Sequence, residues 1–305
     1  MCREVLEKMI KIGTSGFSFP DWRGVIYPKN IQPRDALRYY EQEFGFDTVE
    51  INFTYYTLPG LKTMEGLAKK TTEKFDFVVK AFRGMTHDPF DSRLEKRPEL
   101  SEVKVTFEKF LYSMKPLMEG KKLGAILLQF PVFFYPRSES KDYILQCKEW
   151  LGDVPAVIEF RNRAWAKPET FAFLKENDLA YCIVDEPKLP RLMPFVEEIT
   201  SSIGYLRLHG RNKNWFNVPT SERYNYLYSD NELKDFIDPI KRIHQKAQKG
   251  YVFFNNCHAG AAARNALQMK NFLRDIVEMG ERTKELLRKT VLPEQQEFFK
   301  EEGKG

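Results

Sequence analysis

The chain has 305 residues, of which 42% are hydrophobic and 30% are charged, a length that suits one large α/β barrel or two ordinary domains. This composition excludes an intrinsically disordered chain and a membrane protein. Lys and Arg number 48 against 43 Asp and Glu, a balance that permits an anionic partner without requiring one.

Eight segments along the chain have the apolar, β-branched and aromatic character of strands and are bounded by Gly, Pro or polar residues. In chain order they are Ile10–Ser15, Thr48–Asn52, Phe75–Phe82, Gly124–Pro131, Ala156–Arg161, Ala180–Glu186, Gly204–His209 and Tyr251–Asn256. Most are nearly continuous hydrophobic runs, which is typical of strands covered by helices on both faces.

Helical periodicity fills most of the intervals between these strands. Longer helices are predicted over Pro33–Phe44, Val103–Met118, Asn231–Gln248 and Ala261–Met279, and shorter ones over Leu61–Lys70, Tyr143–Leu151 and Pro168–Glu176. We expect Pro116 to bend or end the second of the longer helices. The segment Pro187–Thr200 contains three prolines, so an irregular connection is predicted there.

Eight strands alternating with helices predict a single (β/α)8 barrel over residues 1–280. The main alternative is a doubly wound open sheet, which usually carries a GxGxxG turn after its first strand. That turn reads Gly13-Thr14-Ser15-Gly16-Phe17 and lacks the pattern. Residues 281–305 are charged and interrupted by Pro293, so they are expected to form a tail that is either an appended helix or frayed.

The sequence also predicts a cytoplasmic location. Met1–Lys11 mixes charged with apolar residues and has no small-residue cleavage site, so no signal peptide is expected. The stretch Gly124–Pro136 is the longest with little charge, and it is shorter than the ~18 residues that span a bilayer. The four cysteines, Cys2, Cys147, Cys182 and Cys257, are far apart and form no CxxC pair, which disfavours a zinc ribbon or a disulfide scaffold.

Polar side chains at the strand ends predict a site at the C-terminal face of the barrel. Because side chains alternate along a strand, Val49 and Ile51 facing the helices leave Glu50 inward. The same reasoning gives an inward set comprising Glu50, Asn52, Lys80, Gln129, Glu159, Arg161, Asp185, Arg207, His209 and either Asn255 or Asn256. Acids and bases alternate in this set, so mutual pairing is expected, and one interpretation is a purely structural ion network.

The catalytic candidates are Glu50, Glu159, Asp185 and His209, as groups that transfer protons. The same four side chains could instead hold a single divalent metal ion, but three interleaved cations and a total of four histidines disfavour a zinc cluster. We therefore assign no metal ligands and expect no cofactor. Glycoside hydrolysis by paired carboxylates has the residue types, although the second and fifth strands are far apart around the ring.

Anion binding is predicted between the last two loops. The segment Asn255–Ala262 leaves backbone N–H groups open at a helix N-terminus, where phosphate is favoured; a helix start packed on the barrel is the alternative. The predicted ligand-binding residues are Lys80, Gln129, Arg161, Arg207, Arg211, Asn255, Asn256 and Gly260. Aromatic residues of the loops are expected at the rim: Phe17, Trp22, Tyr55, Trp165 and Trp215, with Phe19, Tyr56, Phe216, Tyr224, Tyr226 and Tyr228 nearby.

The same residues carry a family resemblance. The blocks are Ile12–Ser18 with Trp22 and Tyr27-Pro28, Val49–Asn52 with Thr54–Tyr56, Gln129–Pro131, Glu159–Arg161 with Trp165, Val184–Pro187, Arg207–Gly210, and Phe254–Asn256 with Ala262 and Asn265-Ala266. In this order they resemble the YecE-like family, also called domain of unknown function 72. The resemblance runs from about residue 10 to 275 and implies a TIM barrel with its site at the matched strand ends.

The resemblance implies no established activity. The family fold is similar to the endonuclease IV and xylose isomerase barrels, from which a nucleic-acid role has been inferred, but this chain lacks the histidine-rich metal centre of those enzymes. We therefore predict a barrel that binds a phosphate-bearing small molecule or nucleic acid. If the protein is an enzyme, we expect it to be a hydrolase. The alternatives are a sugar-active or sugar-isomerising enzyme and a non-catalytic interaction protein.

Overall fold

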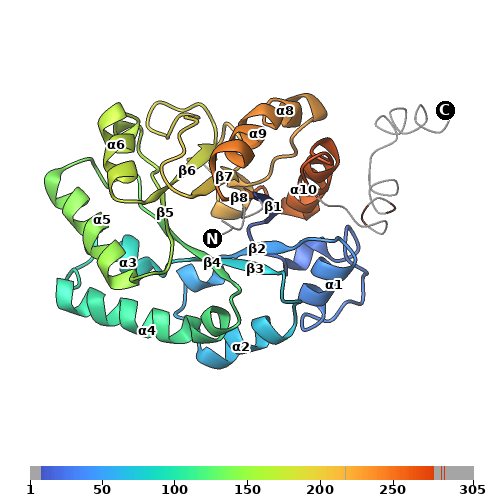
Figure 1. Cartoon of the computed structure of the whole chain (residues 1–305), viewed down its shortest axis with the longest axis horizontal. Coiled ribbons are helices and arrows are strands. Elements are labelled where there is room, and N and C mark those ends of the chain that lie inside the picture. The colour runs from blue at the N-terminus through green and yellow to red at the C-terminus, as the bar shows by residue number, and fades with distance from the viewer. Residues whose placement is uncertain (1–7, 217, 278–282, 284, 286–305) are drawn as a thin grey trace, which may run out of the picture.

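The computed structural model describes residues 8–216, 218–277, 283 and 285, and its centre is a ring of eight parallel strands with helices outside it (Figure 1). The strands are β1 (Met9–Thr14), β2 (Thr48–Ile51), β3 (Asp76–Lys80), β4 (Leu123–Gln129), β5 (Ala156–Glu159), β6 (Ala180–Asp185), β7 (Ile203–Leu208) and β8 (Lys249–Phe254). Their order in the sheet is β1-β8-β7-β6-β5-β4-β3-β2. The predicted (β/α)8 barrel is confirmed.

The helices follow the predicted positions, with local differences. They are α1 (Ala36–Gln42), α2 (Leu61–Lys69), α3 (Arg83–Thr86), α4 (Leu100–Glu119), α5 (Ser138–Leu151), α6 (Pro168–Glu176), α7 (Thr220–Arg223), α8 (Asp230–Lys234), α9 (Ile237–Lys246) and α10 (Ala261–Phe272). Short 3-10 turns are η1 (Pro20–Trp22), η2 (Phe53–Tyr55), η3 (Asp88–Phe90), η4 (Arg163–Trp165) and η5 (His258–Gly260). Residues 186–202 contain no helix or strand, as their prolines predict.

Two helices differ from the sequence prediction. Pro116 does not end α4, which continues to Glu119 and ends at Gly120. The helix predicted over Asn231–Gln248 is two helices, α8 and α9, because the chain turns at Asp235 and Phe236. Phe236 is buried there and packs edge-on against Tyr228.

The barrel closes between β1 and β2 through a seam that is not an ordinary ladder. These two strands share the bridge Ser15–Glu50. Below it, the Tyr40 hydroxyl of α1 accepts a hydrogen bond from Thr14 N at 2.9 Å and donates to Thr48 O at 3.2 Å. Gly13 makes room for this hydroxyl, since a Cβ on Gly13 would lie 2.3 Å from Thr48 O and 3.0 Å from the Tyr40 hydroxyl. A side chain thus replaces backbone pairing at the seam.

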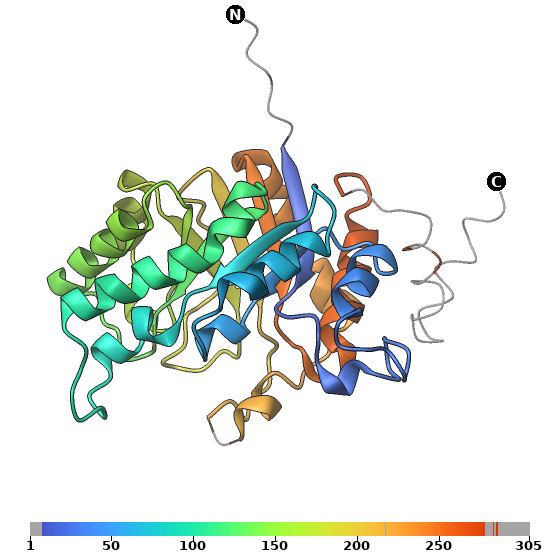
Figure 2. The ribbon, with the colours of Figure 1, turned by 90° about the horizontal axis from the view of Figure 1, so that it is seen from below.

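The two ends of the barrel differ in chemistry. At the N-terminal ends of the strands, Asp76 bridges Lys11 (3.3 Å) and Lys249 (2.9 Å) and accepts a hydrogen bond from Tyr251. At the opposite end, the connecting loops gather, and the segment between β7 and β8, gold in Figure 2, projects furthest beyond the strands. Loop-borne groups therefore surround the C-terminal mouth.

The predicted tail, residues 281–305, lies outside the described residues apart from Thr283 and Glu285. The Thr283 hydroxyl is buried and donates to Phe44 O at 3.2 Å. Within the part of the chain that the structure describes, no helix combines the length and the apolar character that crossing a bilayer requires.

Candidate functional site

A buried ion network fills the barrel just below its C-terminal mouth. Arg207 of β7 donates from Nη2 to Glu50 Oε1 at 2.6 Å and from Nη1 to Glu159 Oε2 at 2.5 Å. Tyr205 completes the shell of Glu50 with a 2.6 Å hydrogen bond to its Oε2. All four side chains are buried, as expected for residues pointing into a closed barrel. Three strands far apart in sequence thus meet at one guanidinium.

Glu159 is the hub from which the network spreads. Its Oε1 accepts from Gln129 Nε2 at 2.6 Å and from Arg161 Nη1 at 3.0 Å. Arg161 also reaches Glu186 Oε2 at 2.7 Å. The Arg207, His209 and Arg161 groups around Glu159 hold its pKa well below the ordinary value, although its burial acts in the opposite direction. Glu159 is therefore an ionised structural acceptor at neutral pH.

The structure does not bring Asp185 into this network. Its carboxylate binds Arg211 Nε and Nη2 at 2.9 Å and accepts from the Tyr228 hydroxyl at 2.6 Å. Asp185 therefore holds the β7–β8 segment against β6. Arg211 contributes to this contact, because it also pairs with Glu232 at 3.3 Å. The sequence predicts Asp185 in the inward-facing set, but its neighbour Glu186 is the residue that joins the network, through Arg161.

The reason lies in the alternation of β6. Cys182 Sγ lies 3.9 Å from Glu159 Oε2, so the even-numbered residues of this strand face inward, and Glu186 continues that set. Glu186 Oε1 accepts from Met193 N at 2.9 Å, and burial raises the pKa of Glu186 to about 7. Counting in steps of two from an inward-facing Cys182 would have placed Glu186, and not Asp185, on the inner side of β6.

His209 is enclosed within the network. Its Nδ1 lies 2.8 Å from Asn255 Nδ2, and its Nε2 lies 3.3 Å from Glu159 Oε1 and 3.1 Å from Arg161 Nη1. Burial, followed by the nearby Arg161 charge, lowers the pKa of His209 to about 3. Efficient general acid–base groups have a pKa near the working pH, and the pKa of His209 lies far below it.

A cavity of about 360 Å³ opens above the network at the C-terminal mouth. It is lined by Ser15, Phe19, Asn52, Tyr55, Tyr56, Lys80, Gln129, Arg207, Tyr224, Asn255 and Cys257. Among these described lining residues two are cations and none is Asp or Glu. Glu50 and Glu159, the predicted catalytic carboxylates, lie beneath the cavity and have no exposed surface.

Lys80, the last residue of β3, is the cavity's distinctive group. Its Nζ donates to Gln129 Oε1 at 2.7 Å and lies 4.3 Å from the centroid of the Tyr55 ring. It forms no ion pair with any described residue. Burial lowers the pKa of Lys80 to about 7, and the Arg207 charge acts in the same direction. The amine therefore titrates near neutrality at the wall of an open cavity.

Three polar atoms of the cavity wall lack hydrogen-bond partners within the described structure. They are Ser15 Oγ, Asn52 Oδ1 and Arg207 Nε, and Ser15 and Arg207 are almost completely buried. Buried polar groups are nearly always satisfied in native proteins, so these three enclosed atoms, which belong to residues that line the cavity, are candidates for contact with a polar ligand. They supply one hydroxyl, one acceptor and one N–H donor.

In the predicted phosphate cradle between the last two loops, one backbone N–H is already bound by the protein's own carboxylate. Asp21 Oδ2 accepts a hydrogen bond from Ala259 N at 2.6 Å. Gly260, with φ of 78°, packs against Ile26, which a Cβ on Gly260 would approach to 3.0 Å. Asn256 likewise serves packing, because its Nδ2 donates to Tyr226 O at 2.9 Å. This segment therefore supports the alternative, a helix start packed on the barrel.

Of the five aromatic residues assigned to the rim, Tyr55 lines the cavity. Trp22 is buried with its indole bound to Cys257 O, Trp165 stacks on Phe160 with centroids 4.2 Å apart, and Phe17 packs on Tyr40. Trp215 is buried against the Arg161 guanidinium at 5.4 Å. The other cavity aromatics are Phe19, Tyr56 and Tyr224, which the sequence places near the rim.

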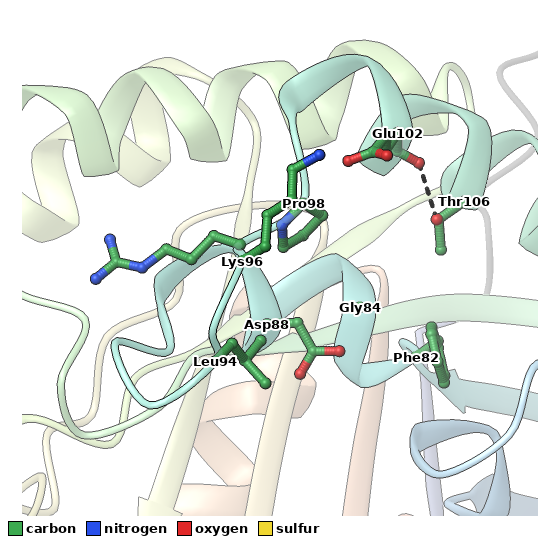
Figure 3. Close-up of a pocket in the computed structure, with 9 residues that line it drawn as sticks. Phe82, Gly84, Asp88, Leu94, Lys96, Pro98, Glu102 and Thr106 are labelled. Atoms are coloured by element: carbon green, nitrogen blue, oxygen red, sulfur yellow. Dashed lines mark hydrogen bonds between the residues drawn. The ribbon is translucent and has the colours of Figure 1, made fainter.

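Other features of the described residues are weaker candidates. Within the described ranges, no three His, Cys, Asp or Glu side chains are grouped so as to hold a metal ion. A second cavity, of about 400 Å³, lies outside the barrel between α3, η3 and the start of α4 (Figure 3). Its two acids already have partners, since Asp88 pairs with Arg83 at 2.9 Å and Glu102 accepts from Glu99 N at 2.7 Å, so the cavity of the barrel mouth is the stronger candidate.

Comparison with known proteins gives the family. The model described as "Protein of unknown function DUF72" matches residues 11–289. UPF0759 protein YunF of Bacillus subtilis is 32% identical over 289 residues, covering 87% of this chain and 95% of its own. A DUF72 family protein of Thermotoga maritima is 39% identical with a TM-score of 0.80, covering 87% of this chain and 99% of that one.

A DUF72 family protein of Enterococcus faecalis is 30% identical with a TM-score of 0.77, over 89% of this chain and 97% of that one. Sequence and fold thus agree over nearly the whole length of each relative. The chain belongs to the DUF72 family, whose function these relatives leave unnamed.

Proposed function

We propose that the C-terminal mouth of the barrel binds a small phosphate-bearing molecule and that Lys80 pairs with its charge. The observation that supports this most directly is an amine without a described carboxylate partner on the wall of a 360 Å³ cavity. A partly buried cation is costly unless it is paired, so an anionic ligand would relieve that cost. Arg207 Nε, Ser15 Oγ and Asn52 Oδ1 supply further polar contacts.

A small molecule suits the site better than a nucleic-acid polymer. Arg161 and Arg211, which the sequence assigned to phosphate, are held by Glu186 and Asp185 respectively. A volume near 360 Å³ lies within the ~300–1,000 Å³ of small-molecule pockets. The aromatic rings of Phe19, Tyr55 and Tyr224 offer apolar faces on which a sugar or a base would stack.

The arrangement also favours proton transfer by Lys80. Glu50 and Glu159 are saturated by Arg207 and lie below the cavity, whereas the Lys80 amine is at its wall. The pKa of Lys80 near 7 matches the requirement for exchange of a proton at neutral pH. The carboxylates then act indirectly, because Glu159 orients Gln129 and Gln129 orients Lys80.

Titration calorimetry with a panel of small phosphate esters tests this proposal, with glycerol 3-phosphate compared with glycerol and with a single-stranded oligonucleotide. We expect esters to bind, glycerol to fail, and Lys80→Gln to weaken binding at least tenfold. Lys122→Gln is the matched control, because Lys122 is a buried lysine that donates to Ala68 O and Thr71 O at the other end of the barrel. Tighter oligonucleotide binding with a steep salt dependence would favour nucleic acid instead, and no binding by any ester would refute the proposal.

Ser15→Ala is expected to weaken ester binding about tenfold without lowering the melting temperature. The Ser15 hydroxyl has no described partner, and removing an unsatisfied buried polar atom relieves a cost of about 1–3 kcal/mol. Ser113→Ala provides the contrast, since its hydroxyl donates to Pro59 O at 2.6 Å: we expect a lower melting temperature and unchanged affinity. Calorimetry measures the affinity of each variant, and thermal denaturation measures its melting temperature. A Ser15→Ala protein that loses stability but keeps its affinity contradicts a ligand role for this hydroxyl.

Ester affinity should fall as pH rises from 7 to 9. The Lys80 ammonium predominates below its pKa of about 7 and is lost above it, while a phosphate monoester with a second pKa near ~6 stays fully ionised. We expect a tenfold or greater weakening by pH 9. In Lys80→Arg the charge persists, so affinity measured by calorimetry should stay level over this range. An equal decline in both proteins would assign the titration to another group.

A further inference from the structure

The surroundings of Lys80 are those of an amine held for reaction. Its backbone is fixed at the end of β3, where Lys80 O accepts from Thr54 Oγ1 at 2.5 Å. Its Nζ has the neutral acceptor Gln129 Oε1 on one side and the face of Tyr55 on another. A carboxylate partner would hold the amine protonated, whereas an amide oxygen accepts an N–H from the neutral amine as readily. The lone pair of that neutral amine is free to face the cavity.

We propose that Lys80 Nζ forms an imine with the carbonyl carbon of a phosphate-bearing aldehyde or ketone bound in the cavity of the barrel mouth. This inference rests on the proposed function and names its substrate class. The protonated amine of Lys80 would attract the anionic ligand, and its neutral form would then attack the carbonyl while Arg207 remains as the cation of the cavity wall. Lysines that form such adducts are desolvated or lie beside another cation, and both conditions hold for Lys80, which is near Arg207 in the same cavity wall. The pKa of about 7 leaves roughly half of the amine neutral at pH 7.

The reaction balances without a redox partner. The lone pair of Nζ attacks the carbonyl carbon and forms a C–N bond, while the C=O pair moves to oxygen. A proton lost from nitrogen goes to that oxygen and gives a carbinolamine. The C–O bond then breaks, the oxygen takes the second proton of the original amine and leaves as water, and the nitrogen lone pair forms C=N. Carbonyl compound and amine thus become imine and water.

The cavity offers separate places for the two ends of such a ligand. Arg207 Nε and Ser15 Oγ are enclosed polar atoms without described hydrogen-bond partners, and Asn52 and Asn255 add amides to the wall. The rings of Tyr55 and Phe19 add apolar surface to the same wall. An adjacent hydroxyl on the ligand would donate to Asn52 Oδ1, which has no described donor.

Reductive trapping tests the inference with two matched pairs of probes. Dihydroxyacetone phosphate and ribose 5-phosphate carry a carbonyl, whereas glycerol 3-phosphate and ribitol 5-phosphate carry a hydroxyl at that carbon. Each is incubated with the full-length protein and sodium borohydride, whose hydride reduces the imine to a stable secondary amine. Intact mass and peptide mapping then locate the adduct. In parallel, calorimetry without borohydride measures binding of all four.

We expect one adduct per chain, equal in mass to the carbonyl probe less one oxygen atom, on the peptide that contains Lys80. Lys80→Arg should abolish it while retaining the positive charge, and Lys122→Arg should leave it unchanged. Binding of both members of a pair without any adduct would overturn the imine and leave the proposed function standing. An adduct that persists in Lys80→Arg would also overturn it, as labelling of other lysines. If none of the four probes binds or reacts, both proposals fail for these ligands.

Discussion

Arg207→Met is expected to destabilise the protein by about 3–5 kcal/mol, the cost of removing one partner from a buried ion cluster. Arg207 is 1% exposed and bridges Glu50 and Glu159, neither of which has exposed surface. Its loss leaves two carboxylates facing each other inside the barrel without the guanidinium between them. Methionine keeps the length of the side chain, so the effect is chiefly electrostatic. Urea denaturation followed by circular dichroism gives the free energy of unfolding.

The control for this change is an exposed ion pair. Glu65→Gln removes the partner of Lys69 within α2, and such surface pairs contribute well under about 1 kcal/mol. A second comparison is the triple variant Glu50→Gln, Glu159→Gln, Arg207→Met, which removes the charges together and should recover part of the lost stability. If Arg207→Met costs no more than the surface control, the three charges are not coupled as the structure shows.

Tyr40→Phe is expected to lower the free energy of unfolding by about 2–4 kcal/mol, because it leaves buried backbone groups on both sides of the barrel seam without hydrogen-bond partners. The hydroxyl accepts from Thr14 N and from Thr14 Oγ1 and donates to Thr48 O. Tyr40 is completely buried, so water cannot replace these bonds. Hydrogen exchange should also show faster exchange of the Thr14 amide, because the hydroxyl is its partner across the seam.

Tyr143→Phe is the matched control for the seam. Tyr143 is also buried, but its hydroxyl donates to Met85 O at 2.7 Å and has the Cys147 thiol beside it, and it joins no two strands. We expect a loss near ~1 kcal/mol in the same urea titration. Equal costs for the two tyrosines would mean that the Tyr40 hydroxyl contributes one ordinary hydrogen bond and does not join the strands.

These two regions divide the interior into parts with different roles. The seam and the Arg207 cluster give the barrel its closure and its charge balance, and neither needs a ligand. Lys80, Asn52 and Ser15 belong to the wall above them, and Asn52 and Ser15 carry polar atoms without described partners. A purely structural network would explain the seam and the Arg207 cluster. The ligand hypothesis accounts in addition for these polar atoms and for an amine that has no ion-pair partner among the described residues.

Residue order alone was sufficient for the fold and for most of the inward-facing set. The strand runs and the helical periodicity are local patterns, and the two-residue alternation places Glu50, Glu159 and Arg207 on one side of their strands. A closed parallel ring then requires their carboxyl ends to share one mouth. Local chemistry was likewise enough to predict the irregular Pro187–Thr200 connection.

Closure of the ring and the routes of the loops decided the rest. Asp21 reaches Ala259 from the other end of the chain, the β7–β8 segment draws Arg211 onto Asp185, and burial moves the pKa values of His209 and Lys80 in ways that no residue type specifies. Charge–charge energies and desolvation depend on distances between residues remote in sequence. Those distances exist only in the folded barrel, and for this reason the proposal of Lys80 as the reactive group could be made only from the tertiary structure.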